Sequence, residues 1–578
     1  MADANGGGDG DGNPVEVGGE LPSLTAACFL ADIANRHGDR EALCFEGGSE
    51  SYRALAAASG RLARALLGAG VVKGARVAVQ LANRPEWIES FFAVSSIGAV
   101  FVPISTLATR EERDYMLRHC DASLFILQPS LGNHAYLDDL LADHPELAEG
   151  TPGSLRCKAF PYLRRVVSIS LSGPHGRVQA MDELLKLGED VSRELLAAAS
   201  QEVTASDDAI IIYTSGTTAR PKAVLHRQRS LLVNGLRFAR WMELVTTDRV
   251  WTAQPFFWTA GIAMSLISTL DAGACLILQE AFEADRSLAL IESQHATIIH
   301  AWAHQQIALA EHPSAPNRDL SALRNVGAGS PLAAHVPSAK NGWSLQASYG
   351  LSETFTLFAT LPADSPDELR LSTHGKPLPG NSLRIVDPES REPLATGEFG
   401  EIAVKGFTLM RGYYKVDPEE TFDVNGFFGT QDGGFVDAAG HLHWTGRLSN
   451  MIKTGGANVS PLEIEAALAT FEPLKVGMAV GVPHPTLGEA IVLCAVARED
   501  RGAISELFEG DLLQHLRDRV ASYKVPKCVL VVRAEDLDFT GTQKIAYEPL
   551  RNLALARLRA LRIEIDGHRY ADDSQQPR

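Results

Sequence analysis

Hydrophobic and polar positions follow helical and strand spacings along most of the chain. Residues 55–69 carry Ala and Leu at helical spacing with arginines between them, and the short β-branched run ARVAVQL follows at 75–81. The same order recurs at 86–96 and 98–104 (GAVFVPI). A helix followed by a buried strand, repeated along the chain, is typical of a layered α/β fold.

At about residue 384 the sequence pattern changes to short strands separated by Gly, Asp and Pro, which predicts a smaller β-rich subdomain. These strands are LRIVD, GEIAVKG and HLHWTG, at 383–387, 400–406 and 441–446. Helix and strand patterns then return, at 461–470, 476–483, 490–497 and, for a last helix, 512–520. We expect an α/β protein with a large N-terminal domain of layered α/β subdomains plus this β-rich subdomain, and a small α+β C-terminal domain.

The expected domain boundaries follow from these changes in pattern. Residues 1–20 are too rich in Gly and Asp to bury a core and are expected to be a disordered tail. The N-terminal domain is expected at 21–447, a hinge at 448–450, the C-terminal domain at 450–565 and a flexible tail at 566–578.

Composition narrows the class of protein. The 578 residues are 45% hydrophobic and 21% charged, as in a soluble multidomain protein, and the net charge of −18 argues against binding nucleic acid. Seven scattered cysteines without a C-x-x-C pair favour a reducing compartment and argue against disulfides and a structural zinc site. No signal peptide and no apolar run of membrane-spanning length is present, so a cytoplasmic location is expected.

A segment of small and hydroxylated residues follows the buried-strand candidate at 209–212. Residues 213–222 read YTSGTTARPK; the N–H groups and hydroxyls of such a loop can wrap an anion, and Lys222 adds a compact positive charge. The segment is neither a GxxxxGK[ST] loop nor a GxGxxG turn. It predicts a phosphate-binding loop of another type, the alternative being a plain Ser/Thr-rich surface turn.

This loop resembles the phosphate-loop motif of the adenylate-forming superfamily, which includes acyl- and aryl-CoA synthetases. Similar motifs follow in the family's order over nearly the whole chain. They are NRPEW at 83–87, GAVFVP at 98–103, PFFWTAG at 255–261, GAGSPL at 327–332, SYGLSET at 348–354, FGTQD at 428–432, GR at 446–447, MIKTGGANVSPLEIE at 451–465 and TGTQKI at 540–545. The resemblance implies an ATP-dependent acid–thiol ligase that makes an acyl-AMP and passes the acyl group to coenzyme A.

The resemblance also assigns roles to residues of the nucleotide site. Tyr349 would lie against adenine, Ser352 would reach the α-phosphate and Glu353 would help to hold Mg²⁺. The phosphate loop and the loops beside adenine would bind the nucleotide through Thr214, Ser215, Gly216, Thr217, Thr218, Lys222, Gly327, Ala328, Gly329 and Gly350.

In the last third of the chain, the resemblance implies that Asp432 accepts hydrogen bonds from the ribose and that Arg447 contacts ribose or phosphate. Lys544 would be the adenylation lysine, which completes a catalytic set with Thr214, Ser352 and Glu353. Ser449 would be the hinge of a mobile C-terminal domain. Its rotation would replace Lys544 by the segment with Lys453, Gly455 and Gly456, where paired glycines leave room for a pantetheine arm.

The acid would lie near the motif PFFWTAG. Trp258, Gly261 and Trp302 are the expected pocket residues, and Trp258 stands where many family members have His, so its indole would narrow or cap the pocket. For Trp302 and for Phe355 and Phe358, packing in the core is the alternative.

Several positions depart from the family's pattern: Ala219, Ala223, Gln431 and Gln543 stand in place of glycines, and Asn450 in place of an acidic residue. Two other functions stay open, an acyl-AMP ligase with another acceptor and a ligand-binding relative without turnover. Retention of Lys222, Glu353, Asp432, Arg447 and Lys544 argues against the latter. The expected cofactors are ATP, Mg²⁺ and coenzyme A, and the partner is a hydrophobic small-molecule carboxylic acid that the sequence does not identify; a homodimer is one open assembly.

Overall fold

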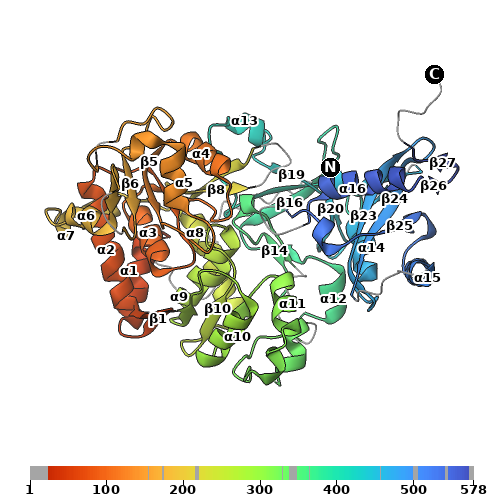
Figure 1. Cartoon of the computed structure of the whole chain (residues 1–578), viewed down its shortest axis with the longest axis horizontal. Coiled ribbons are helices and arrows are strands. Elements are labelled where there is room, and N and C mark those ends of the chain that lie inside the picture. The colour runs from red at the N-terminus through yellow and green to blue at the C-terminus, as the bar shows by residue number, and fades with distance from the viewer. Residues whose placement is uncertain are drawn as a thin grey trace, which may run out of the picture. The chain divides into compact units, whose positions relative to one another are not determined.

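The computed structural model describes residues 24–153, 155–171, 175–214, 220–327, 330–337, 348–362, 365–455, 457–498, 506–539 and 545–571. The chain divides into two compact units. The first comprises residues 1–382 and 404–428, and the second comprises residues 383–403 and 429–578. Figure 1 follows the elements of both units in chain order.

Two sheets organise the first unit. The larger has the order β18-β9-β8-β4-β3-β5-β6-β7, parallel from β8 to β7, with β9 antiparallel to β8 and to β18. Its strands are Gly412–Tyr413, Lys222–Arg227, Asp208–Thr214, Val100–Pro103, Arg76–Gln80, Ala122–Leu127, Arg165–Ser168 and Val178–Ala180, in that order. The smaller has the order β12-β10-β11-β1-β2, formed by Ile298–His300, Arg249–Thr252, Cys275–Ile277, Glu41–Phe45 and Gly48–Ser51.

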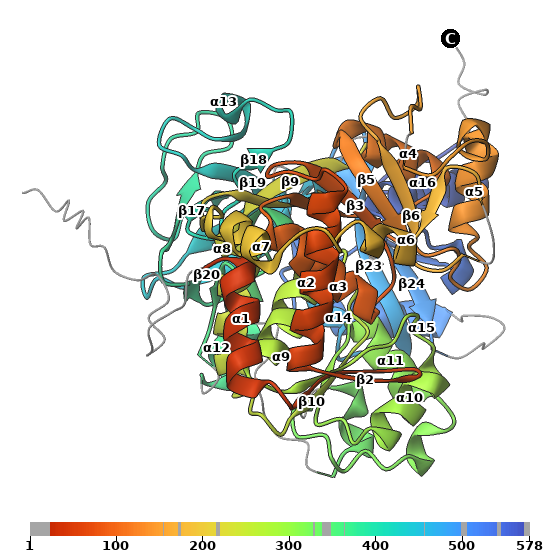
Figure 2. The same ribbon diagram turned by 90° about the vertical axis from the view of Figure 1, so that its left-hand side faces the viewer.

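The side-chain alternation of the strands divides the core into layers. In β5, Leu124 and Ile126 belong to a cluster shared with the smaller sheet, whereas Phe125 and Leu127 belong to a second cluster on the opposite face. Helices α1, α2 and α3 lie side by side over the first cluster (Figure 2). Both faces of the parallel sheet are therefore covered, as its continuous apolar strands require.

The two helices predicted in the first unit, at 55–69 and 86–96, are present with slightly shifted ends. The described α-helices of this unit are α1 Ala26–His37, α2 Tyr52–Gly68, α3 Pro85–Ser96, α4 Arg110–His119, α5 Tyr136–Asp143, α6 Met181–Lys186, α7 Arg193–Gln201, α8 Gln228–Trp241, α9 Ser268–Asp271, α10 Ala284–Ser293, α11 Ala303–Glu311, α12 Asp367–Ser372 and α13 Pro418–Thr421. A three-stranded sheet adds β13 Ser348–Tyr349, β14 Ala359–Thr360 and β15 Lys376–Pro377. The helix expected at 55–69 begins earlier because the Ser51 side chain caps it by accepting from the Ala54 N–H.

The β-rich region forms a four-stranded sheet of β16 Asn381–Val386, β17 Gly400–Gly406, β19 Phe428–Val436 and β20 Leu442–Arg447. The rest of the second unit is a sheet with helices on its two faces. Its strands are β21 Ile452–Thr454, β22 Ala457–Val459, β23 Leu474–His484, β24 Gly488–Ala497 and β25 Cys528–Val531, and its helices are α14 Pro461–Leu468, α15 Glu506–Arg517 and α16 Tyr547–Ala560. In β24, Val492 packs with α16 and Leu493 packs with α14 and α15.

The predicted fold class is confirmed: the chain is a mixed α/β protein with a large N-terminal and a small C-terminal domain. Two expectations are corrected. The helix expected at 512–520 ends at Arg517, after which the N–H groups of Arg519 and Val520 both turn back to the Leu516 carbonyl. Residues 566–571 are folded, because β27 His568–Arg569 pairs with β26 Glu564–Ile565 and Tyr570 is buried.

The predicted domain boundaries and hinge stay predictions, and the predicted tail at 1–20 and residues 572–578 lie outside the described residues. Among the described residues, no helix combines the length and the apolar character needed to cross a bilayer.

Candidate active site

The β8–β9 hairpin frames the predicted phosphate loop. Thr214 ends β8, Lys222 begins β9, and the two residues pair directly in the antiparallel ladder. The loop residues between them, Ser215, Gly216, Thr217, Thr218 and Ala219, lie outside the described residues. Thr214 and Lys222 are therefore held at the two ends of one loop, as an anion-binding segment requires.

Lys222 and Glu353 meet at a residue that sequence reasoning missed. The Lys222 ammonium lies 5.1 Å from the ring centre of Tyr413, and the Tyr413 hydroxyl donates a hydrogen bond of 2.7 Å to Glu353 Oε1. Tyr413 lies on β18, which pairs with β9. A backbone bond from the Met410 N–H to the Glu353 carbonyl, 2.7 Å long, ties the same two segments together. The structure thus brings two predicted side chains, Lys222 and Glu353, together with Tyr413 from a third segment.

The segment that carries Tyr349, Ser352 and Glu353 is a tight loop. Tyr349 is buried on β13, and a Cβ atom at Gly350 would lie 1.5 Å from the Thr356 carbonyl oxygen. After Glu353, Phe355 and Thr356 both adopt positive φ angles, 51° and 85°. Such backbone is costly for residues other than glycine, so the surrounding structure must stabilise it.

Two buried side chains supply that support. The Asn234 side-chain amide of α8 donates to the carbonyl oxygens of Thr354, Phe355 and Leu357, at 3.2, 2.7 and 2.9 Å. The His226 ring nitrogen Nε2 lies 2.7 Å from the Ser352 carbonyl oxygen. Burial lowers the pKa of His226 to about 4, so its imidazole is neutral at pH 7 and its single N–H donates to that carbonyl.

Replacing Asn234 with alanine is expected to slow the predicted adenylation reaction by roughly 10- to 100-fold, because the loop that carries the expected site residues Ser352 and Glu353 loses its brace. The fold should also lose about 1–3 kcal/mol of stability, since buried carbonyls lose their donor. Single-turnover adenylation by the folded protein separates the two effects. Asn317→Ala, at an exposed position, is the control; equal rates in both variants would contradict the bracing role.

The expected acid-pocket residues lie together. The rings of Trp258 and Trp302 are 6.3 Å apart and inclined by 68°, an edge-to-face arrangement, and both side chains are half-buried. Gly261 begins the buried π-helical turn Gly261–Ile267, and a Cβ atom there would lie 2.3 Å from the Pro255 carbonyl oxygen. Phe355 and Phe358 are fully buried core residues.

Gly327 is described, whereas Ala328 and Gly329, its expected partners beside adenine, lie outside the described residues.

In the second unit, Asp432 and Arg447 pair across the β19–β20 ladder. Arg447 Nε lies 3.1 Å from Asp432 Oδ1, and its Nη1 donates to the Thr430 carbonyl at 2.6 Å. The Asp432 carboxylate is buried while Arg447 is exposed, so this cation offsets part of the cost of burying the anion.

Gln431, which stands in place of a glycine beside Asp432, has a φ angle of 61°. Gln431→Gly should therefore stabilise the second unit by about 0.5–1 kcal/mol, because glycine adopts left-handed backbone without strain. Urea unfolding, monitored by hydrogen exchange at residues 429–447, would measure this change in stability. As the matched control, Gln514→Gly in α15 should destabilise by about 1 kcal/mol; destabilisation by both changes would be evidence against strain at Gln431.

The remaining predicted residues belong to the second unit or lie outside the described chain. Ser449 lies in the 3-10 turn Leu448–Asn450, and Lys453 is an exposed residue of β21. Gly455 has a φ angle of 58°, and its N–H donates to the Leu487 carbonyl. Gly456, Gln543 and Lys544 lie outside the described residues.

The fold and the motifs define an adenylate-forming enzyme. The family model of the AMP-binding enzyme matches residues 30–414, and that of the AMP-binding enzyme C-terminal domain matches residues 463–544. The chain belongs to the AMP-binding enzyme family. The resemblance predicted from the motifs is thereby confirmed.

Relatives and solved structures agree along nearly the whole chain. A feruloyl-CoA synthase of Amycolatopsis sp is 31% identical, covering 91% of this chain and 97% of the relative, and an indoleacetate–CoA ligase of Aromatoleum aromaticum is 30% identical, covering 91% and 98%. ATP-bound MatB from Rhodopseudomonas palustris matches with a TM-score of 0.71 at 26% identity, over 92% of this chain and 99% of that chain. The chain is accordingly an AMP-forming acyl-CoA ligase, which uses ATP and coenzyme A.

Proposed function

We propose that this ligase activates a hydrophobic, ring-containing carboxylic acid with ATP and Mg²⁺ and then transfers its acyl group to coenzyme A. The observation that carries the choice of acid is the edge-to-face pair of Trp258 and Trp302, which offers flat apolar surface to a substrate ring. The feruloyl- and indoleacetate-specific names of two relatives support an aromatic acid. All seven cysteines are free thiols, which supports the proposed location in the cytoplasm.

In the first half-reaction, the acid's carboxylate oxygen attacks the α-phosphate of ATP and pyrophosphate leaves. Both nucleophile and leaving group are anionic, so the protein's task is to position them and to offset their charge. We assign the phosphates to residues 214–218 and Lys222, and the contact with the reacting carboxylate and α-phosphate to Lys544. We propose that the Ser352 hydroxyl donates a hydrogen bond to an oxygen of the α-phosphate.

Glu353 fits a magnesium ligand, because carboxylate oxygens are what Mg²⁺ prefers and the Tyr413 hydroxyl fixes one oxygen of this carboxylate. Bound Mg²⁺ would add positive charge at the phosphates. Tyr349, Gly350 and residues 327–329 are proposed to hold adenine, and Asp432 and Arg447 the ribose.

The second half-reaction needs the thiol of coenzyme A to reach the acyl carbon. We propose that a rotation of the C-terminal domain at Ser449 withdraws Lys544 and presents Lys453, Gly455 and Gly456. At Gly455 a Cβ atom would meet no neighbour within 4 Å, so the backbone there is open to an approaching pantetheine arm.

Pyrophosphate release across straight-chain, one-ring, two-ring and steroidal acids, each with and without coenzyme A, tests the proposal. A thioester from a ring-containing acid, identified by mass, is the expected product. Preference for straight-chain acids would overturn the assignment of the substrate, and AMP-ester or amide products without a thioester would overturn the assignment of the acceptor.

Trp258→Ala should enlarge the pocket that the indole now narrows. We expect the ratio of kcat/KM for a two-ring acid to that for a one-ring acid to rise roughly 10- to 100-fold. Trp241→Phe, at the last residue of α8, removes an indole that is not an expected pocket residue and should leave the ratio unchanged. An unchanged ratio in Trp258→Ala would remove this residue from the pocket.

A further inference from the structure

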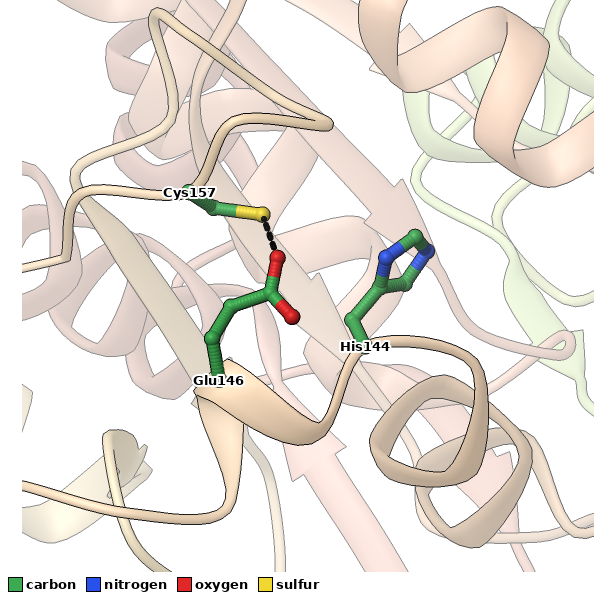
Figure 3. A group of neighbouring side chains, drawn as sticks. All are labelled: His144, Glu146 and Cys157. Atoms are coloured by element: carbon green, nitrogen blue, oxygen red, sulfur yellow. Dashed lines mark hydrogen bonds between the residues drawn. The ribbon is translucent and has the colours of Figure 1, made fainter.

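Three side chains with metal-binding atoms converge in the first unit, outside the residues proposed for adenylation. His144, Glu146 and Cys157 point toward one another in Figure 3, and their candidate ligand atoms all lie within 4.8 Å of one another. The Cys157 thiol donates a hydrogen bond of 3.0 Å to Glu146 Oε1. Nitrogen, oxygen and sulfur donors are thus gathered at one point.

The backbone that carries these side chains is anchored in the core. His144 follows α5, and Glu146 lies in the 3-10 turn Pro145–Leu147, whose Leu147 is fully buried. Leu155 and Phe160, on either side of Cys157, are buried in the same cluster. The His144 ring packs edge-on against Phe160, with centroids 4.7 Å apart. The backbone that carries the donors is therefore held in place before any ion binds.

A fourth residue orients the histidine. His144 Nε2 lies 2.7 Å from Asp114 Oδ2, while Figure 3 shows the other ring nitrogen turned toward the Glu146 carboxylate. Asp114 also forms an ion pair with Arg113, whose Nη2 lies 2.8 Å from Asp114 Oδ1. With Nε2–H donating to Asp114, the lone pair of Nδ1 faces the cluster. A carboxylate that fixes the ring and tautomer in this way is the usual partner of a metal-binding histidine.

We propose that His144 Nδ1, Glu146 and Cys157 bind one Zn²⁺, with water as the fourth ligand. A thiolate, an imidazole and a carboxylate suit Zn²⁺ and exclude Mg²⁺ and Ca²⁺, which prefer all-oxygen sites. Ligand atoms around tetrahedral Zn²⁺ lie roughly 3.3–3.8 Å apart, so the cluster must contract by about 1 Å, which the exposed Glu146 side chain permits.

Charge supports the same assignment. On binding, the Cys157 proton leaves to solvent, and thiolate plus carboxylate balance the two charges of the ion. The bound ion would link the C-terminal end of α5 to the loop that carries Cys157. The scattered cysteines argued against a structural zinc site, because the sequence lacks a C-x-x-C pair; the proposed ligands are instead a mixed set.

Two titrations of the full-length protein test the site, after a chelator has removed any bound metal. The first adds Co²⁺, and the second displaces the bound Co²⁺ with Zn²⁺ in the presence of a competing chelator. One equivalent should bind with a thiolate-to-cobalt charge-transfer band. Cys157→Ser should abolish the band, and Glu146→Gln, at an exposed position that folding tolerates, should weaken Zn²⁺ at least tenfold. Asp114→Asn should weaken it about 10- to 100-fold.

Cys28→Ser is the matched control, since Cys28 is an exposed free thiol elsewhere, and it should leave band and affinity unchanged. Circular dichroism of each variant verifies folding. The absence of the band from the wild type, its persistence in Cys157→Ser, or unchanged affinity in Glu146→Gln would each overturn the proposal and leave a simple thiol–carboxylate hydrogen bond.

Discussion

Replacing Lys544 with alanine is expected to lower acyl-adenylate formation by on the order of 10²- to 10³-fold, because the reacting carboxylate and α-phosphate would lose the mobile positive charge that we propose for Lys544. Thioester formation from supplied acyl-AMP should continue at close to the wild-type rate, since the lysine is proposed to withdraw before the thiol arrives. Rapid-quench measurement of each half-reaction provides the comparison.

Gly456→Trp should produce the opposite pattern, with adenylation retained and transfer to coenzyme A lost, because an indole would fill the proposed path of the pantetheine arm. Lys475→Ala is the control for Lys544→Ala, because it removes an exposed lysine from β23 of the second unit. Equal loss of both half-reactions in Lys544→Ala and in Gly456→Trp would contradict the two-conformation mechanism.

Glu353→Gln is expected to slow adenylation by roughly 10²- to 10³-fold and to raise the Mg²⁺ concentration needed for half-maximal rate. Glutamine keeps an acceptor for the Tyr413 hydroxyl but lacks the charge that would hold the ion. Tyr413→Phe keeps the charge and loses the hydrogen bond, so a smaller loss of about tenfold is expected.

Tyr414→Phe is the matched control, because the adjacent Tyr414 hydroxyl also donates to a carboxylate, Asp121 Oδ2 at 3.1 Å, away from Glu353. Initial rates over a range of Mg²⁺ concentrations distinguish the variants. An unchanged Mg²⁺ requirement in Glu353→Gln would remove this residue as the ligand, and equal losses in the two tyrosine variants would remove Tyr413 from the site.

Local pattern was sufficient to predict much of the fold. Leu124 and Phe125 point to opposite faces of a strand as any β alternation requires, and the helix beginning at Pro85 follows from its apolar spacing and its proline at the first turn. The resemblance supplied the candidate site residues, including Glu353 and Lys222, but it did not supply what holds them.

Long-range contacts account for what the sequence could not predict. Asn234 braces carbonyls about 120 residues away, and Tyr413 lies 60 residues from the Glu353 carboxylate it contacts. Nothing in the sequence around Asn234 distinguishes it from an asparagine buried in the core, and nothing around Tyr413 distinguishes it from a tyrosine on the surface. The left-handed backbone of Phe355 and Thr356 was equally hidden, because nothing in their residue types favours it.

The most direct test of the account follows the oxygen of the acid. When the accepted carboxylic acid carries ¹⁸O in both carboxylate positions, attack on the α-phosphate must place one labelled oxygen in the AMP that is released with the thioester. We predict AMP with a single ¹⁸O and unlabelled pyrophosphate by mass spectrometry. Label in inorganic phosphate with ADP as the nucleotide product, or AMP without label, would contradict an acyl-adenylate pathway.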